Sequence, residues 1–178
     1  MDALVVAIAQ YLLYVLVAAA AVVWLMCDRP GKVRLAAEAV AGLALVGIGI
    51  WVAARLHTDP RPFVHDPNSR PLFAHPADNG FPSDHSAAAG LVTALVFRYR
   101  RLLGVLVGGG AVLIGWSRVA AHVHHAQDVV AGLGIGILAG AAAIWLVQRL
   151  LNALESRGHA LAPGRVGRTT ADREGGSR

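Results

Sequence analysis

The sequence predicts an all-α protein, a polytopic membrane helical bundle of about five transmembrane helices. Of its 178 residues, 56% are hydrophobic and 15% are charged, a more apolar composition than a soluble domain of this size usually has. Several apolar runs approach the roughly 20 residues that a helix needs to cross a bilayer. The spans are expected near residues 3–27, 35–55, 84–99, 102–117 and 124–150, within one membrane domain of residues 1–157.

The first, second and fifth runs each predict a transmembrane helix on their own. Residues 3–27 are interrupted only by Gln10 and two tyrosines, and the chain starts Met-Asp-Ala-Leu rather than with the basic residues of a signal peptide. Glu38 lies near one end of the second run, where a carboxylate reaches the membrane surface at little cost, so we expect no functional role for it. The third and fourth runs are shorter, and the third starts from a polar cluster.

Basic residues fall mainly on one side of the bundle if the spans alternate in direction. Twelve of the 16 lysines and arginines lie on one side of the bundle. They are found between spans one and two, between spans three and four, or at the end of span five and beyond it. Because cytoplasmic loops are enriched in Lys and Arg, we expect the N-terminus outside the cell and residues 158–178 as a disordered basic tail in the cytoplasm. This orientation explains the net charge of +5 without a nucleic-acid partner.

The opposite side carries most of the titratable groups. Residues 57–83 contain six prolines, which prevent a regular helix and predict a long extracytoplasmic loop. Polar groups gathered at one membrane face predict a functional site there, so we expect this loop to be an active-site loop. Seven of the eight histidines and five aspartates lie on this side: His57, His65, His75, His85, His122, His124, His125, Asp59, Asp66, Asp78, Asp84 and Asp128.

The densest polar cluster is at residues 117–128, which read SRVAAHVHHAQD. If the fifth helix begins near Ala121, His124 and Asp128 are four residues apart on one helical face. The carboxylate then binds one imidazole nitrogen and leaves the other as an oriented lone pair, which suits a nucleophile. Arg118 precedes this pair and offers the forked geometry that binds two phosphate oxygens.

Two further clusters complete a set of groups suited to phosphate. In FPSDHS, residues 81–86, Ser83 is a good N-cap. The free N–H groups of the first helical turn would form an anion site beside His85, a candidate proton donor. In DPRPF, residues 59–63, Arg61 lies in a stiff segment between prolines. Two arginines, a helix N-terminus and two histidines together suit phosphoryl transfer, in which catalysis is mostly positioning and cationic stabilisation.

These motifs resemble those of a known family. Three segments resemble the signature motifs of the type 2 phosphatidic acid phosphatase superfamily: RP at 61–62, PSDH at 82–85 and SRVAAHVHHAQD at 117–128. Asp84 replaces the usual glycine of the second motif, which makes the chain similar to the bacitracin-resistance type of undecaprenyl-diphosphate phosphatases. The lysine of the first motif would stand at Ala54, and its neighbour Arg55 is the candidate replacement for that cation.

The resemblance implies hydrolysis through a phosphohistidine, with no metal and no other cofactor. His124 would attack phosphorus while Asp128 orients it, and His85 would protonate the leaving group and then activate water. The reaction implied converts a polyprenyl diphosphate of the undecaprenyl type to the monophosphate and phosphate, which recycles the cell-wall lipid carrier at the plasma membrane. The substrate-binding residues implied are Arg61, Arg118, Ser83, Asp84 and Arg55.

Three alternatives stay open. A phosphatase of phosphatidic acid or phosphatidylglycerophosphate needs the same phosphate cradle. A lipid transporter without hydrolysis typically carries internal repeats, and none is visible in the sequence. A zinc-dependent membrane hydrolase needs several ligands, although HVHH lacks the i, i+4 histidine pair of zinc-binding helices. Its candidate ligands are His85, His122, His124, His125 and Asp128.

The remaining polar residues carry weaker indications. The single cysteine, Cys27, excludes a disulfide within the chain and a metal site built from several thiolates. The roles of His122, His125 and Asp84 stay open, as does the oligomeric state. Four histidines have the character of ordinary polar residues near a membrane interface, and we assign them no function: His57, His65, His75 and His159.

Overall fold

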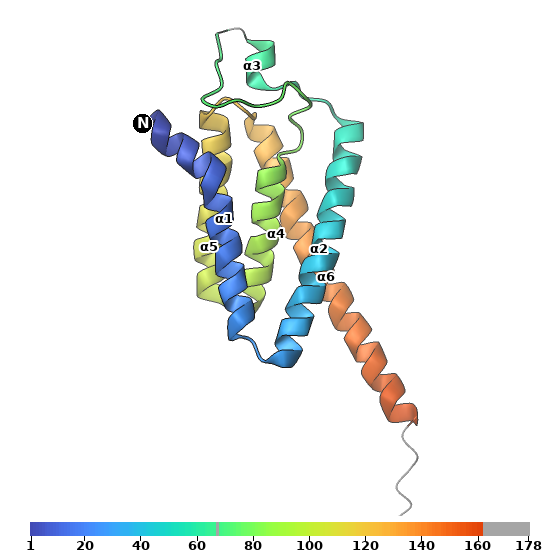
Figure 1. The fold of residues 1–178 in the computed structure, drawn as a ribbon. Coiled ribbons are helices and arrows are strands. Elements are labelled where there is room, and N and C mark those ends of the chain that lie inside the picture. Colours follow the sequence, from blue (N-terminus) through green and yellow to red (C-terminus); the bar gives the residue numbers. More distant parts are fainter. Residues whose placement is uncertain (67, 162–178) are drawn as a thin grey trace, which may run out of the picture.

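The computed structural model describes residues 1–66 and 68–161 of the chain. This part contains helices and loops, with one isolated β-bridge between Pro60 and Asn79, so the predicted all-α fold is confirmed. Five long helices run alternately in opposite directions, and a loop with a short helix covers one end of the bundle (Figure 1). The helices are α1 (Asp2–Met26), α2 (Arg29–Leu56), α3 (Pro62–His65), α4 (Asp84–Tyr99), α5 (Arg101–Ala120) and α6 (Ala126–Leu161).

Helix α4 is the shortest of the five long helices and packs against the four others, α1, α2, α5 and α6. Those four have the length and hydropathy of membrane spans. The 16 residues of α4 extend about 24 Å at the helical rise per residue, which is less than the roughly 30 Å hydrocarbon core of a bilayer. The helix predicted at 84–99 is therefore present as a core helix that the four longer ones enclose.

The fifth predicted span begins later than expected. We predicted a span near 124–150, and a shared helical face for His124 and Asp128 required a start near Ala121, but α5 continues to Ala120 and α6 starts only at Ala126. Between them His122 has a φ of 59°, and this left-handed conformation is one that ends helices. At its other end α6 continues to Leu161, into the first residues of the predicted tail. The rest of that tail lies outside the described residues.

The loop after α2 contains a helical turn that the sequence did not predict. Pro62 occupies the first position of α3, where a helix has no use for the N–H group that proline lacks. The loop then returns to the bundle through a cis peptide bond between Phe81 and Pro82. Ser83 follows directly as the N-cap of α4, and its hydroxyl accepts a hydrogen bond from the backbone N–H of Ser86, as the sequence predicted.

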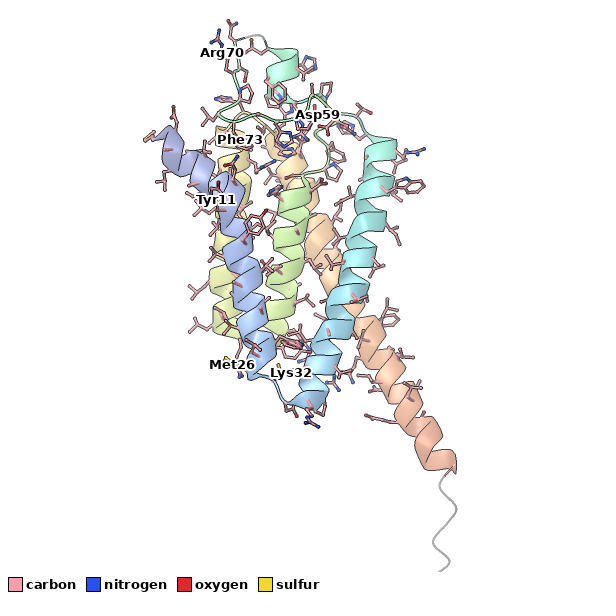
Figure 2. The ribbon with its side chains drawn as sticks, viewed as in Figure 1. Tyr11, Met26, Lys32, Asp59, Arg70 and Phe73 are labelled. Carbon is pink, nitrogen blue, oxygen red and sulfur yellow. The ribbon has the colours of Figure 1, made fainter. Side chains whose placement is uncertain are left out.

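Basic residues separate between the two ends of the bundle, as the predicted alternation of spans requires. Arg70 lies on the loop at one end, and Lys32 lies at the opposite end, where α1 meets α2 (Figure 2). The connection between α4 and α5 is also at that opposite end (Figure 1). The described cations that belong to these two connections or to the later part of α6 are Arg29, Lys32, Arg34, Arg98, Arg100, Arg101 and Arg149.

Glu38 differs from its predicted placement. Only 1% of this residue is exposed, and its Oε2 accepts a 2.9 Å hydrogen bond from the hydroxyl of Tyr99. We expected the carboxyl group to reach a membrane surface. It instead joins α2 to the end of α4 inside the bundle. Since this contact lies at the end of α4 opposite Ser83, it fixes the helix that carries one wall of the candidate site.

Helices α4 and α6 approach each other so closely that their contact requires glycine. A Cβ at Gly136 would lie 2.0 Å from the carbonyl oxygen of Ala87, and one at Gly132 would lie 2.4 Å from that of Ser83. Both obstacles are backbone atoms, which cannot rotate away as a side chain can. Gly134, between the two on α6, has no atom within 4 Å of such a Cβ. The glycine spacing of this helix therefore serves close packing on one face.

We expect Gly136→Ala to destabilise the bundle by about 1–3 kcal/mol, because overpacking a tight contact usually costs that much. The measurement is the thermal unfolding temperature in detergent, which should fall. Gly134→Ala is the matched control. Since its methyl group meets open space and alanine favours helix more than glycine does, its unfolding temperature should stay the same or rise. Equal losses of stability in the two variants would contradict the α4–α6 contact.

Candidate active site

Five parts of the chain meet at the end of the bundle that the loop covers. They are the last turns of α2, the loop itself, the first turn of α4, the last turn of α5 and the short turn between α5 and α6. They enclose a cavity of about 220 Å³. Eight polar residues line this cavity: Arg61, His75, Asp78, Asn79, Asp84, His85, Arg118 and His124.

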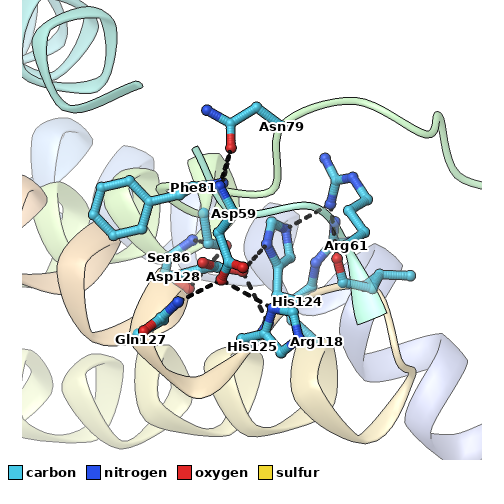
Figure 3. Close-up of polar contacts among 12 residues, drawn as sticks. Asp59, Arg61, Asn79, Phe81, Ser86, Arg118, His124, His125, Gln127 and Asp128 are labelled. Atoms are coloured by element: carbon cyan, nitrogen blue, oxygen red, sulfur yellow. Dashed lines mark hydrogen bonds and ion pairs between the residues drawn. The ribbon is translucent and has the colours of Figure 1, made fainter. Parts of the chain in front are cut away.

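His124 is the most enclosed histidine of this cavity, with 3% of the residue exposed. Its Nδ1 lies 3.3 Å from Oδ2 of Asp128, and Asp128 is fully buried in the first turn of α6. The predicted pair is therefore present, but the predicted reason was wrong. His124 lies in the turn before α6, not on the helix, and the turn rather than a helical face brings the two groups together (Figure 3).

Arg61 lies against the other ring nitrogen of His124. Its Nε donates a 2.8 Å hydrogen bond to Asp78, and its Nη1 donates one of 2.8 Å to the carbonyl of Val123. The same Nη1 is 3.3 Å from Nε2 of His124. These contacts favour the tautomer with the proton on Nδ1, facing Asp128, because Nε2 then accepts from the arginine. The lone pair of Nε2 is thus directed toward the guanidinium of Arg61, a group that can also bind an anion.

Arg118, at the end of α5, is 2% exposed. Its Nη2 lies 2.9 Å from Nε2 of His75, and its guanidinium stacks on Phe73 at 5.5 Å from the ring centroid. Its Nε is buried without a hydrogen-bond partner among the described residues. A buried guanidinium with a free donor at a cavity wall is suited to an anionic ligand.

Of the three residues predicted at the start of α4, two line the cavity and the third does not. Asp84 and His85 line it. Ser83 does not, because its fully buried hydroxyl contacts Ser86 at 3.1 Å inside the bundle. The backbone N–H of Ser83 instead donates to the carbonyl of Asp128 at 3.0 Å. Ser83 therefore joins the start of α4 to the start of α6, and its side chain is not placed to touch a ligand.

Arg55 is not brought to the site. Its side chain is exposed and its guanidinium lies over the ring of Trp51, 5.2 Å from the centroid. Ala54, where the family motif would have lysine, does line the cavity. Adjacent residues of a helix point about 100° apart, so a cation at position 55 cannot take the place of one at position 54. The expectation that Arg55 replaces the missing lysine is wrong in this structure.

His75 is a functional candidate that sequence reasoning missed. We assigned it no function, yet it lines the cavity, contacts Arg118, and has its ring centroid 6.2 Å from that of His124. Its position depends on the path of a proline-rich loop, for which the sequence offers no periodicity. The two histidines whose roles the sequence left open, His122 and His125, lie outside the cavity. His122 is exposed, and the Nδ1 of His125 lies 2.9 Å from Oδ2 of Asp59.

One group of residues has the composition of a metal site. Candidate ligand atoms of Asp59, His125 and Asp128 all lie within 4.8 Å of one another. This group differs from the zinc ligands that the sequence suggested, because Asp59 was not among them and His122 is exposed on the turn. Such carboxylate and imidazole ligands fit a divalent cation by type, although Asp128 is also the partner of His124.

Burial and neighbouring cations act together on the histidines of the loop and turn. Burial lowers the pKa of His124 below its ordinary value of 6.5, and the charges of Arg118 and Arg61 lower it further against the opposing effect of Asp128. Burial followed by the same two arginines also lowers the pKa of His75. Both rings are therefore neutral at pH 7, which is the state in which an imidazole nitrogen can act as a nucleophile.

Asp78 completes the electrostatic arrangement at the rim. Burial would raise the pKa of its carboxyl group, but the hydrogen bond from Arg61 and the charge of that arginine lower it overall. Asp78 therefore stays ionised and holds the guanidinium of Arg61 from the solvent side. This residue was also not predicted from the sequence.

Comparison with known proteins agrees with this geometry. Residues 35–151 match the family model of the PAP2 superfamily. The chain is 29% identical over 143 residues to the bacitracin transport permease protein BcrC of Bacillus licheniformis, covering 80% of this chain and 70% of that protein. It is 30% identical over 142 residues to the undecaprenyl-diphosphatase BcrC of Bacillus subtilis, covering 79% and 72%. The crystal structure of Aquifex aeolicus LpxE is similar, with a TM-score of 0.67 and 25% identity over 80% of this chain and 84% of that one.

We expect kcat/KM for phosphate release from a lipid substrate to fall at acidic pH with an apparent pKa below 6.5. The pKa of His124 is lowered from 6.5, so the ring is neutral at pH 7 and gains a proton only as the pH falls through the lowered value. Protonation removes the lone pair, and activity should be lost there. A pH–rate profile measures this limb, and an acidic limb centred above 6.5 would contradict the electrostatic account of His124.

Proposed function

The chain belongs to the PAP2 superfamily and is a membrane-embedded lipid phosphatase, and from this premise we propose that its substrate is a polyprenyl diphosphate of the undecaprenyl type. The products would be the polyprenyl monophosphate and inorganic phosphate. The observation that carries the proposal is the buried imidazole of His124, held between the carboxylate of Asp128 and the guanidinium of Arg61. The name of the Bacillus subtilis relative, an undecaprenyl-diphosphatase, supports the substrate class.

His124 is proposed as the nucleophile. Its Nε2 attacks the terminal phosphorus, a nitrogen–phosphorus bond forms, and the bond from phosphorus to the bridging oxygen breaks. Asp128 holds the Nδ1 proton and stabilises the positive charge that develops on the ring. The phosphate displaces Nε2 from its contact with Arg61 and takes that donor for one of its own oxygens.

His85 is proposed as the proton donor and acceptor. It shares the cavity with His124 and Arg118. Burial and then the charge of Arg118 disfavour a protonated ring, and the negative charge of a bound phosphate would oppose both effects. His85 gives its proton to the departing lipid phosphate in the first step. In the second step it takes a proton from water, whose oxygen attacks the phosphohistidine, so that phosphate leaves and His124 is restored.

The two arginines are proposed to hold the phosphoryl oxygens, as phosphoryl transfer requires cations around its equatorial oxygens. Arg118 would exchange its contact with His75 for the substrate. Asp84 lies on the same wall, where its charge attracts Arg118 and restricts the guanidinium. Ser83 contributes by fixing the start of α4, and the backbone N–H groups beside His85 complete the cradle.

Two other functions have specific support and are outcomes of the same test. Phosphatidic acid or phosphatidylglycerophosphate would fit the same cradle, because the residues assigned here would hold the phosphate group and none is assigned to the lipid part. Transport is suggested by the name of the Bacillus licheniformis relative, a bacitracin transport permease protein. A nucleophilic imidazole with its orienting carboxylate favours hydrolysis over transport, which needs neither group.

The cavity is proposed to face the outside of the plasma membrane. Support comes from Arg29, Lys32, Arg34, Arg98, Arg100 and Arg101, which belong to the connections at the end of the bundle opposite the loop (Figure 1), since Lys and Arg are enriched on the cytoplasmic side. The membrane domain would then comprise residues 1–157, with the N-terminus outside and the C-terminal tail in the cytoplasm. A site at the outer face can return the lipid carrier of cell-wall synthesis to its monophosphate form.

We expect His124→Ala to lower phosphate release from undecaprenyl diphosphate by about a thousandfold or more, the scale of loss when a nucleophile is removed. His122→Ala is the matched control, because His122 lies two residues away but is exposed and outside the cavity. It should keep the activity of the unmodified protein. The measurement is a phosphate-release assay on both variants in detergent micelles.

The same assay separates the alternatives. A panel with phosphatidic acid and phosphatidylglycerophosphate should show lower kcat/KM than the polyprenyl diphosphate, and the reverse order would assign a glycerolipid substrate. EDTA should leave activity unchanged. Loss of activity in chelator, with zinc bound in stoichiometric amount, would support a metal-dependent hydrolase at Asp59, His125 and Asp128. Lipid translocation by the His124→Ala variant, without phosphate release, would support a transporter.

Cysteine labelling tests the proposed orientation. In a Cys27→Ala background, we expect Arg70→Cys to react with a membrane-impermeant maleimide in intact cells, because Arg70 is exposed on the loop. Arg29→Cys, exposed at the opposite end of the bundle, should react only after the membrane is permeabilised. The reverse pattern of labelling would place the cavity on the cytoplasmic side.

A further inference from the structure

Asp59 begins the segment DPRPF, in which the sequence predicted a role only for Arg61, yet Asp59 joins the loop to the turn that carries His124. Its Oδ2 accepts a 2.5 Å hydrogen bond from Nε2 of Gln127 and lies 2.9 Å from Nδ1 of His125. Only 9% of Asp59 is exposed. A carboxylate so enclosed needs its partners, because burying a charge without them is costly. Asp59 and these two neighbours are drawn together in Figure 3.

The backbone of Asp59 is fixed as firmly as its side chain. Its N–H donates to Oδ1 of Asn79 at 2.9 Å, and its carbonyl accepts from the N–H of Gly80 at 2.9 Å. A Cβ at Gly80 would lie 3.1 Å from the Asp59 carbonyl oxygen and 3.2 Å from Oδ2 of Asp128. The two arms of the loop and the start of α6 therefore meet here with no space between them.

The residues that Asp59 joins are direct neighbours of the reacting groups. Arg61 is two residues after Asp59, and His124 immediately precedes His125. The contact between Asp59 and His125 therefore fixes the segment of Arg61 against the segment of His124, whose functional atoms lie 3.3 Å apart. We propose that Asp59, through His125 and Gln127, is a positioning residue that sets the geometry of the His124–Asp128 pair for catalysis; this rests on the phosphatase function proposed above.

Competition for Asp128 supplies the physical reason. The backbone N–H of His125 already donates to Oδ2 of Asp128 at 2.8 Å, and the acidic and imidazole atoms of Asp59, His125 and Asp128 lie within 4.8 Å of one another. While Asp59 holds the ring of His125, Asp128 is available to His124. Without Asp59, the nearest carboxylate for that ring is Asp128, which would be drawn from His124.

The test is the kinetic effect of Asp59→Asn. We expect kcat for phosphate release from undecaprenyl diphosphate to fall about tenfold to a hundredfold, the scale of loss from a small misplacement of reacting groups. KM should change less than about threefold, because the phosphate contacts of Arg61 and Arg118 remain. Asp66→Asn is the matched control. Asp66 is exposed in the same loop, its side chain accepts hydrogen bonds from Asn68, and the variant should keep full activity.

A double-variant cycle separates positioning from a general loss of structure. His125→Gln removes the other partner of the same contact and should lower kcat by a similar factor. Asp59→Asn should then cost little more when added to His125→Gln, since the contact is already absent. The proposal would be overturned if the loss of kcat in the double variant equalled the product of the two single losses. It would also be overturned if Asp59→Asn kept its kcat while unfolding at the normal temperature.

The outcome is distinct from failure of the proposed function. If the unmodified protein released no phosphate from any lipid, or if His124→Ala kept full activity, the function itself would be wrong. If Asp59→Asn did not fold, His125→Gln would carry the test alone, because its side chain is 37% exposed and its loss disturbs the core less. An unchanged kcat in that variant would also overturn the role of Asp59.

Discussion

The contact between the imidazole of His124 and the carboxylate of Asp128 determines what this bundle can do. It sets the tautomer of the ring, and so it decides which nitrogen faces the cavity. Both residues are almost fully enclosed, and an enclosed carboxylate needs donors around it. The donors to Oδ2 come from the turn between α5 and α6, where the ring of His124 and the backbone N–H of His125 both contact it. The path of the chain through this turn therefore fixes the carboxylate of Asp128 beside the imidazole of His124.

The cavity also brings two buried arginines together, with Asp78 and Asp84 as the acidic residues of its lining. Arg61 and Arg118 are each about as buried as core residues, and both act on the same two histidines. Cations held near one another away from water repel strongly, and an anion with several oxygens relieves that repulsion at once. Under the proposed function, phosphate binding would recover the cost of assembling the arginines, which in the structure contact Asp78 and His75.

The sequence predicted those parts of the molecule that depend on composition or on short spacing. Apolar runs located the five long helices, and Ser83 located the start of α4. The His124–Asp128 pair was predicted for a helical face, but the left-handed residue His122 made the connection a turn instead. Arg55 was misjudged because neighbours on a helix face different directions. His75, Asp78 and Asp59 were missed because their positions depend on how a proline-rich loop folds back, and that is decided by tertiary contacts with no local signature.

The length of α4 links the fold to the chemistry. Its far end is fixed by the buried hydrogen bond between Tyr99 and Glu38, and its near end carries His85 into the cavity. A helix of about 24 Å cannot reach from one side of a roughly 30 Å hydrocarbon core to the other. The helix N-terminus therefore ends short of the surface that the surrounding helices reach, and this leaves a recess that the loop roofs. A lipid phosphate at the membrane surface can enter such a recess while its chains stay in the bilayer, which is the arrangement that a membrane lipid phosphatase needs.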